Sequence, residues 1–405
     1  MNARMSAGLV SCALVATVCG STAAAYPLFN FFEVTQIAQD AVRGINVPEP
    51  VPGFELVLFK DGRRVYKRSF GAWSSDRVAN ADSATKTLSG AVIMALTDDS
   101  PTPFSLNTKL SDYNPAFVTS KRNIAIRQCF SHTAGFDTDS TAVSNPFITL
   151  QQAALQIASE PLVYPAGTTF SYGGVGMHAA GAIAETVAGQ SWDSLYEQRI
   201  AGPLNFQVTR YVLSSPTNPR IAGGAESNAE EFARFMEMLR NDGVHNGRRV
   251  LSHQAVQQLF TRQTPLGIPV ANSPFRGSAD YGVGVWLDQR LADGTLVGAR
   301  AAGARGFSAW VDFDDGMVGA FSTDLSSGQN VVDLVDAIRD AAQRSVRSPR
   351  PCAADFNADA FLDFRDFDDF VQAFELGDPS SDYNEDGFLT FEDFDAFVQA
   401  FYAGC

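Results

Sequence analysis

Ser83 and Lys86, a serine and a lysine three residues apart, are of the right types and spacing for nucleophilic catalysis. Apolar residues follow at helical spacing, so both would share one face at the start of a helix, with Asp82 as the expected cap. A lysine that loses its proton there takes one from the serine hydroxyl and makes it a nucleophile. Alone, Ser-x-x-Lys is a weak signal, because the pattern also occurs at ordinary helix starts.

A second set of candidate residues lies in segment 352–405, where one acidic pattern occurs twice, 27 residues apart. Each copy places oxygen-bearing side chains at positions 1, 3, 5, 9 and 12 of a loop, the spacing with which proteins surround Ca²⁺. With backbone carbonyls at position 7, the expected ligands are Asp355, Asn357, Asp359, Phe361, Asp363 and Asp366 in the first loop, and Asp382, Asn384, Asp386, Phe388, Thr390 and Asp393 in the second. We expect up to two Ca²⁺ ions, the first held more weakly because Ala360 stands where glycine normally permits the sharp turn.

Each loop runs into a segment with phenylalanines at helical spacing, at 367–374 and again at 394–401. This module resembles a dockerin, a paired loop-helix unit, more than a full EF-hand, because no helix enters either loop. The resemblance implies that the tail attaches the protein to a surface or scaffold protein. An acidic disordered tail is the alternative, but disordered tails are poor in aromatic residues.

Negative charge is concentrated in the same module. It holds 14 of the 45 acidic residues and one of the 30 basic residues, so it carries nearly all of the formal charge of −15. The remaining body is close to neutral, and no basic patch with interleaved aromatic residues occurs. We therefore expect no binding to nucleic acid, whose phosphates the tail would repel.

The first 25 residues have the pattern of a cleaved secretory signal. Arg4 precedes an apolar run at 7–18 that is too short to cross a bilayer, and an Ala-x-Ala sequence ends at Ala25. We expect an exported protein that begins near Tyr26. A lipoprotein signal at Cys12 or Cys19 fits less well, and no later segment is apolar enough to span a membrane.

Three cysteines follow the expected cleavage site. Cys352 and Cys405 bracket the calcium repeat, so a disulfide between them would join its two ends. Two unpaired thiols are the alternative, and Gly404-Cys405 could also be an attachment signal. Cys129 lies in an apolar context, which is typical of a buried free thiol.

Residues 50 to 340 resemble the serine β-lactamase family in its broad sense, which includes class C β-lactamases, D-alanyl-D-alanine carboxypeptidases and esterases. The resemblance rests on three blocks in order: Ser83-x-x-Lys86, Ser131-His132-Thr-Ala-Gly135, and Tyr172-Gly-Gly174. It implies an α/β fold in which an antiparallel sheet is built from both chain ends, with a helical region inserted between them.

The same resemblance implies the roles of the site residues. Ser83 would be the nucleophile, Lys86 its proton partner, and Tyr172 a second acid/base whose phenol the Lys86 ammonium would acidify. The amides of Ser83 and Ala304 would form the oxyanion hole, and Gly303 would let the backbone approach the substrate.

Two departures from the family pattern bear on the substrate. Gly174 stands where relatives have an asparagine that holds the substrate, and Ala301 replaces the cation that binds a β-lactam carboxylate, although Arg300 and Arg305 are near in sequence. We therefore expect a small ester, amide or peptide substrate more than a β-lactam. His132 is read as a residue that holds loops in place, and no histidine spacing indicates zinc.

Strand patterns near both ends of the body agree with that fold. Segments 54–59 and 64–70 flank Asp61-Gly62, a strong hairpin signal, and strands are expected again at 281–288, 309–312 and 318–323. The expected domains are a signal peptide (1–25), a hydrolase domain (26–344), a linker (345–351) and the calcium module (352–405). The predicted protein is a secreted serine hydrolase. The alternative is a non-catalytic binding protein whose tail is the functional part.

Overall fold

The computed structural model describes residues 29–347, 352, 354–357, 362–384 and 387–403. The predicted signal peptide therefore lies outside the described residues. No helix in the described part of the chain is long and apolar enough to span a membrane.

The predicted hairpin is confirmed. Strands β1 (Gly53–Lys60) and β2 (Arg63–Gly71) pair antiparallel. Asp61 and Gly62 between them both have left-handed backbones, with φ of 48° and 84°. Two positive φ angles match the twist of a tight hairpin, which is why an Asp-Gly pair predicts it well.

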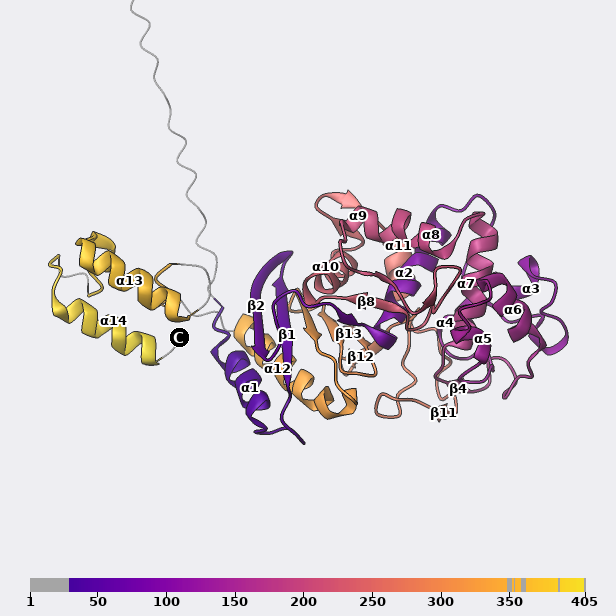
Figure 1. Ribbon diagram of the computed structural model, residues 1–405, viewed down its shortest axis with the longest axis horizontal. Helices are drawn as coiled ribbons and strands as arrows, with labels where there is room; N and C mark the ends of the chain where they lie inside the picture. The colour runs from indigo at the N-terminus through magenta and orange to yellow at the C-terminus, as the bar shows by residue number, and fades with distance from the viewer. Residues whose placement is uncertain (1–28, 348–351, 353, 358–361, 385–386, 404–405) are drawn as a thin grey trace, which may run out of the picture.

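The main sheet joins the two ends of the domain, as predicted. Its six antiparallel strands lie in the order β12-β13-β14-β15-β1-β2 (Figure 1). The four late strands are β12 (Trp286–Arg290), β13 (Leu296–Ala302), β14 (Ser308–Asp312) and β15 (Met317–Ser322). Because β1 pairs with β15, the helical region between them is an insertion into one continuous sheet.

The expected strand at 281–288 is wrong over its first half. Tyr281 makes only an isolated bridge to Trp286, and β12 begins at Trp286. The intervening chain turns at Gly284, whose φ is 77° and where a Cβ would overlap the carbonyl oxygen of Lys86. This segment is therefore shaped by its contact with the helix that carries Lys86.

Helices cover both faces of the sheet. Helices α1 (Phe32–Arg43) and α12 (Val332–Arg347), from opposite ends of the domain, lie side by side on one face (Figure 1). Helix α10 (Ala229–Arg240) packs on the other face. The side chains of β1 alternate accordingly, so that Phe54 packs with α1 and α12 while Val57 joins the larger core beneath the helical region.

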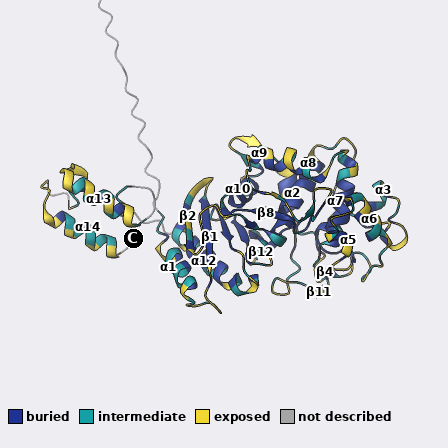
Figure 2. Ribbon diagram, in the orientation of Figure 1, coloured by how far each residue is buried: buried dark blue, intermediate teal, exposed yellow. Residues whose placement is uncertain are grey.

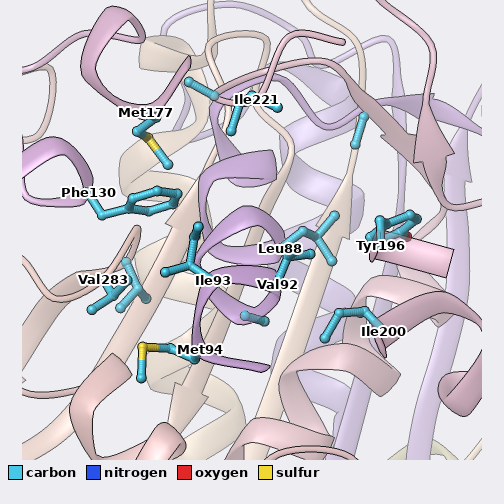
Figure 3. Close-up of a cluster of buried hydrophobic side chains, with 14 of the residues drawn as sticks. Leu88, Val92, Ile93, Met94, Phe130, Met177, Tyr196, Ile200, Ile221 and Val283 are labelled. Atoms are coloured by element: carbon cyan, nitrogen blue, oxygen red, sulfur yellow. The ribbon is translucent and has the colours of Figure 1, made fainter. Parts of the chain in front are cut away.

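Helix α2 (Thr85–Asp98) runs through the middle of that larger core and is buried from Thr85 to Leu96 (Figure 2). Figure 3 shows Leu88, Val92 and Ile93 of α2 among apolar side chains from segments far apart in the chain. A helix that is buried on every side is held in place by the side chains packed around it. The residues at its first turn are therefore fixed in place.

The remaining elements surround this core. The helices are α3 (Leu110–Tyr113), α4 (Ile126–Phe130), α5 (Thr141–Ser144), α6 (Leu150–Ser159), α7 (Val175–Ala188), α8 (Trp192–Tyr196), α9 (Gly202–Leu204) and α11 (His253–Leu259). The short strands are β3 (Ala79–Asn80), β4 (Phe170–Ser171), β5 (Arg210–Tyr211), β6 (Ser214–Ser215), β7 (Asn218–Pro219), β8 (Ala225–Ser227), β9 (Val244–His245), β10 (Arg248–Arg249) and β11 (Val270–Asn272). Single turns of tighter or wider helix occur at η1 (Asp82–Ala84), η2 (Thr119–Lys121), η3 (Glu197–Ala201), η4 (Gly328–Val331) and η5 (Pro379–Ser381). Cys129 is buried and free, as expected.

Helix α12 continues into the segment expected to be a linker. It ends at Arg347, whose guanidinium pairs with Asp315 at 2.7 Å, and Val346 is buried against the domain. These contacts hold 345–347 in the helix. Residues 348–351 lie outside the described part.

The C-terminal segment contains two helices, α13 (Phe364–Leu376) and α14 (Phe391–Ala403). Their phenylalanine stripes pack together, with the rings of Phe370 and Phe397 stacked at 3.9 Å between centroids. Cys352 is disulfide-bonded, but Cys405, its predicted partner, lies outside the described residues.

Candidate functional site

Ser83 lies on a sharp turn between the small strand β3 and helix α2. It is the middle residue of the 3₁₀ turn η1, and Asp82 before it has a left-handed backbone with φ of 46°. Such backbone is strained in a residue other than glycine, and strain of this kind is common at functional sites. Ser83 is half-buried.

The prediction that Asp82 caps the helix is wrong. No side-chain cap is present, because the Asp82 carboxylate instead accepts two hydrogen bonds from the Arg305 guanidinium, at 3.0 and 3.1 Å. Arg305 lies in the loop that follows β13. The ion pair therefore ties the nucleophile turn to that loop.

Lys86 is buried with its amine directed at Ser83. Its Nζ donates to Ser83 Oγ at 3.0 Å and to the carbonyl oxygen of Ala222 at 2.8 Å. Burial, followed by the nearby charge of Arg220, lowers the pKa of Lys86 to about 7, although Asp82 opposes the shift. A substantial share of Lys86 is therefore neutral near pH 7 and able to accept a proton from Ser83.

Tyr172 follows β4 and faces the same serine. Lys86 Nζ lies 4.6 Å from the centre of its ring, which stacks on Trp286 with 5.4 Å between centroids. Burial raises the pKa of Tyr172 to about 12, although hydrogen bonds with Ser83 and Tyr281 act in the opposite direction. The expectation that Lys86 would acidify this phenol is therefore wrong. Burial favours the neutral form of both groups, so Tyr172 keeps its proton.

The predicted oxyanion residues lie beside Ser83. Strand β13 ends at Ala302, and Gly303 passes so close to η1 that a Cβ would overlap the carbonyl oxygen of Ala81. Ala304 follows and lines the same cavities as Ser83. Within the described part of the chain, the N–H groups of Ser83 and Ala304 donate to no other residue. Both remain available for an oxyanion.

Two cavities meet at Ser83, Tyr172 and Ala304. One, of about 180 Å³, is mainly apolar and is bounded by Phe275 and Trp286, with Gly303 at its edge. The other, of about 250 Å³, is more polar. A carbonyl bound at Ser83 would therefore adjoin both cavities. The residues that line the polar cavity are Asp82, Ser83, Lys86, Thr138, Asp139, Val143, Tyr172, Gly173, Gly174, Arg220, Ala222, Gly223 and Ala304.

Neither arginine near Ala301 is available to replace the missing cation. Arg300 is buried and pairs with Asp288 at 2.9 Å and also with Asp336. Arg305 is engaged with Asp82. Another arginine, Arg220, lines the polar cavity together with Ser83 and Lys86. Sequence analysis missed it because nothing in its local sequence links it to Ser83, 137 positions earlier.

His132 holds loops together, in agreement with the sequence interpretation. Its Nδ1 accepts the Gly173 N–H at 3.4 Å, and its ring lies 4.4 Å from that of Tyr172. Burial lowers the pKa of His132 well below its usual value. The imidazole is thus a neutral support behind Tyr172.

The two calcium loops have matching hydrogen bonds around their last predicted ligand. Asp366 accepts the N–H groups of Asn357 and Asp363 at 3.3 and 2.9 Å. Asp393 accepts those of Asn384 and Thr390 at 3.1 and 2.8 Å. The repeat in sequence is therefore a repeat in backbone hydrogen bonding. The predicted ligand atoms of both loops are all oxygens, which suits a hard cation.

Three of the predicted metal ligands, Asp359, Phe361 and Asp386, lie outside the described residues. Among the residues that are described, no three His, Cys, Asp or Glu side chains gather closely enough to hold a metal ion. Calcium binding therefore stays a prediction.

Comparison with known proteins places this geometry in a family. The model of the Beta-lactamase family matches residues 39–343. The chain is 25% identical over 272 residues to Penicillin-binding protein 4 of Amycolatopsis lactamdurans, an alignment that covers 56% of this chain and 70% of the relative. A putative β-lactamase from Bacteroides dorei superposes with a TM-score of 0.69 at 24% identity, over 79% of this chain and all of that one.

A family VIII carboxylesterase has the same fold, with a TM-score of 0.60 at 18% identity over 78% of this chain and 97% of the other. The family match spans most of the hydrolase domain, including Ser83, Lys86 and Tyr172, and stops before the C-terminal segment. The chain belongs to the Beta-lactamase family.

Proposed function

We propose that this protein is a serine hydrolase that cleaves an ester or a small amide through an acyl-enzyme on Ser83. The observation that carries the proposal is the 3.0 Å contact between Lys86 Nζ and Ser83 Oγ, together with burial that lowers the pKa of the lysine to about 7. An ordinary lysine, with a pKa near 10.4, would stay protonated and could not serve as the base.

The reaction would proceed in two acyl transfers. Neutral Lys86 takes the proton of Ser83 as Oγ attacks the carbonyl, and the amides of Ser83 and Ala304 bind the oxyanion. The proton then passes from the Lys86 ammonium through the Tyr172 hydroxyl to the departing alcohol or amine. Water then attacks the acyl carbonyl and gives a proton to Lys86 by the same route. Lys86 returns this proton to Ser83 Oγ as the bond between Oγ and the acyl carbon breaks, which releases the acid and restores the free enzyme.

An ester is the substrate that the site favours. The apolar cavity beside Ser83 has room for an alkyl or aryl group, and no free cation replaces Ala301 on β13 among the described residues. The family VIII carboxylesterase that shares this fold supports the choice of an ester. A bicyclic β-lactam would lose the carboxylate contact that holds it in relatives.

Burst kinetics test the proposal. Short-chain p-nitrophenyl esters should release one equivalent of nitrophenol rapidly and then turn over slowly, because the acyl-enzyme accumulates. Ser83→Ala should abolish both phases. A folded wild-type protein that gives neither phase supports the alternative of a non-catalytic binding protein.

For the C-terminal segment we propose a calcium-dependent attachment module that binds a surface or scaffold protein, and for residues 1–25 a signal that exports the chain. The repeated loop geometry at Asp366 and Asp393 supports the first proposal. Calorimetry on the full chain should detect up to two Ca²⁺ ions, and no heat in the millimolar range would contradict it. N-terminal sequencing of the protein expressed with its leader should begin near Tyr26, and an intact leader would contradict export.

A further inference from the structure

Arg220 stands apart from the other cations near the site. It is partly buried, lines the polar cavity with Ser83 and Lys86, and its Nε is enclosed without a hydrogen-bond partner among the described residues. The guanidinium makes no ion pair or hydrogen bond within that part of the chain. Arg300 and Arg305 each make ion pairs at 3.0 Å or less.

The charges around Arg220 leave it without compensation. Asp82 lines the same cavity, but both of its oxygens bind Arg305. Asp139 lies at the exposed rim and accepts the N–H of Ser140 at 2.8 Å. A partly desolvated cation that lacks a close anion is costly unless a partner arrives. The structure therefore maintains a positive charge where a substrate would lie.

Space for that substrate comes from Gly174. The resemblance to the β-lactamase family implies an asparagine at this position, and a Cβ at Gly174 would meet only the Ala222 side chain, at 3.2 Å. Gly174, which has no side chain, lines the polar cavity together with Ser83 and Arg220. A planar guanidinium is well suited to bind a carboxylate with two parallel hydrogen bonds.

We propose that Arg220 binds a carboxylate of the substrate. The enzyme's preferred substrates would be esters or amides that carry a carboxylate on the polar side of the reacting carbonyl and an apolar group on the other side. The proposal rests on the serine hydrolase function proposed above. It assigns the binding of the anion to Arg220, in the segment before β8, and not to position 301 on β13.

The test compares anionic and neutral substrates in two arms, one with the carboxylate on the acyl group and one with the carboxylate on the leaving group. In the acyl arm, mono-p-nitrophenyl glutarate is compared with p-nitrophenyl pentanoate. In the leaving-group arm, 4-carboxyphenyl butyrate is compared with 4-carbamoylphenyl butyrate. The measured quantity is the ratio of kcat/KM, anionic over neutral, within each variant, so that any effect of Arg220 on Lys86 cancels.

In one arm, Arg220→Met should lower this ratio on the order of 10- to 100-fold, as expected for the loss of a charge-assisted pair. Arg220→Lys should restore part of it, and Asp139→Asn should raise it by removing a like charge. The matched control is Arg210→Met, an exposed arginine paired with Glu226 at 2.8 Å outside the cavity, which should leave the ratio unchanged.

The proposal is overturned if Arg220→Met leaves the ratio of kcat/KM values unchanged in both arms. If neutral esters are still cleaved in that case, the proposed hydrolase function stands without it. Binding without turnover supplies a second measurement. The probe is the amide analogue of the anionic ester in the arm that responds: glutarate monoamide for the acyl arm, or 4-butyramidobenzoate for the leaving-group arm. It should bind the Ser83→Ala protein by calorimetry, and adding Arg220→Met should weaken binding by a similar factor. Equal binding to the two proteins would contradict the proposal whether or not esters are cleaved.

Discussion

The proposed hydrolase site and the predicted calcium loops are built from the chain in opposite ways. Each predicted calcium loop would take its ligands from 12 consecutive residues, and its hydrogen bonds join residues close in sequence, as between Asp393 and Thr390. The hydrolase site collects Ser83, Tyr172, Arg220 and Ala304 from more than 200 positions. A local site can be read from spacing, whereas a dispersed site acquires its chemistry, above all its pKa values, from burial that only the fold creates.

The largest expected effect tests whether the dispersed site acts as one unit. Lys86→Ala and Tyr172→Phe should each lower kcat/KM for p-nitrophenyl butyrate on the order of 100-fold or more, the scale of a positioned acid or base. Because both variants disable the same proton path, the double variant should lose far less than the product of the single losses.

Multiplicative losses in that double-mutant cycle would contradict a shared proton path. Circular dichroism and thermal unfolding of each variant are the control, because Lys86 and Tyr172 contact each other and a change of packing would mimic a loss of chemistry.

A smaller effect is expected at the calcium loops. Asp393→Ala should weaken Ca²⁺ binding on the order of 10-fold or more at the second loop, because position 12 supplies a carboxylate to the ion. Asp366→Ala is the matched variant in the first loop and should affect only the weaker site. Calorimetry on the full chain measures both.

Neither calcium-loop variant, nor removal of calcium by a chelator, should change ester hydrolysis. If removal of calcium also abolished esterase activity, the two sites would depend on each other. That result would contradict the view that each calcium loop is a self-contained local site.

The smallest effect is a change in pH dependence. Lys86 acts as a base only when neutral, so kcat/KM should fall as pH drops through about 7 and level off above it. Arg220 lowers the pKa of Lys86, so replacing Arg220 with methionine should raise that pKa. The fall of kcat/KM on the acid side should therefore occur at higher pH in Arg220→Met than in the wild type. Stopped-flow rates with a neutral ester between pH 5 and 9 measure the shift. A fall that moves to lower pH contradicts this electrostatic account.

Patterns along the chain predicted the parts of the fold that depend on neighbouring residues. Asp61-Gly62 predicted the hairpin, and phenylalanine spacing predicted α13 and α14. The sheet that joins both ends of the domain followed from the resemblance to a family together with strand patterns. The strand expected at 281–288 is wrong before Trp286, because the chain turns at Gly284, where a Cβ would overlap the carbonyl oxygen of Lys86.

Errors at the site all involve distant contacts. The side chain of Asp82 was expected to cap its own helix, but it is bound by Arg305, 223 positions away. Tyr172 was expected to be acidified by a charge, but burial is the stronger influence on both Tyr172 and Lys86. Arg220 escaped notice because its role depends on a cavity that no local pattern reveals.

The central claim is that burial lowers the pKa of Lys86 and so allows this lysine to activate Ser83. Covalent labelling tests the claim most directly. The full chain is treated with a fluorophosphonate at pH 8, and the intact mass is measured, followed by peptide mapping. We predict one adduct, located on Ser83, formed much more slowly in Lys86→Ala and absent from Ser83→Ala. A folded wild-type protein that remains unlabelled, or that is labelled at another residue, would contradict the claim.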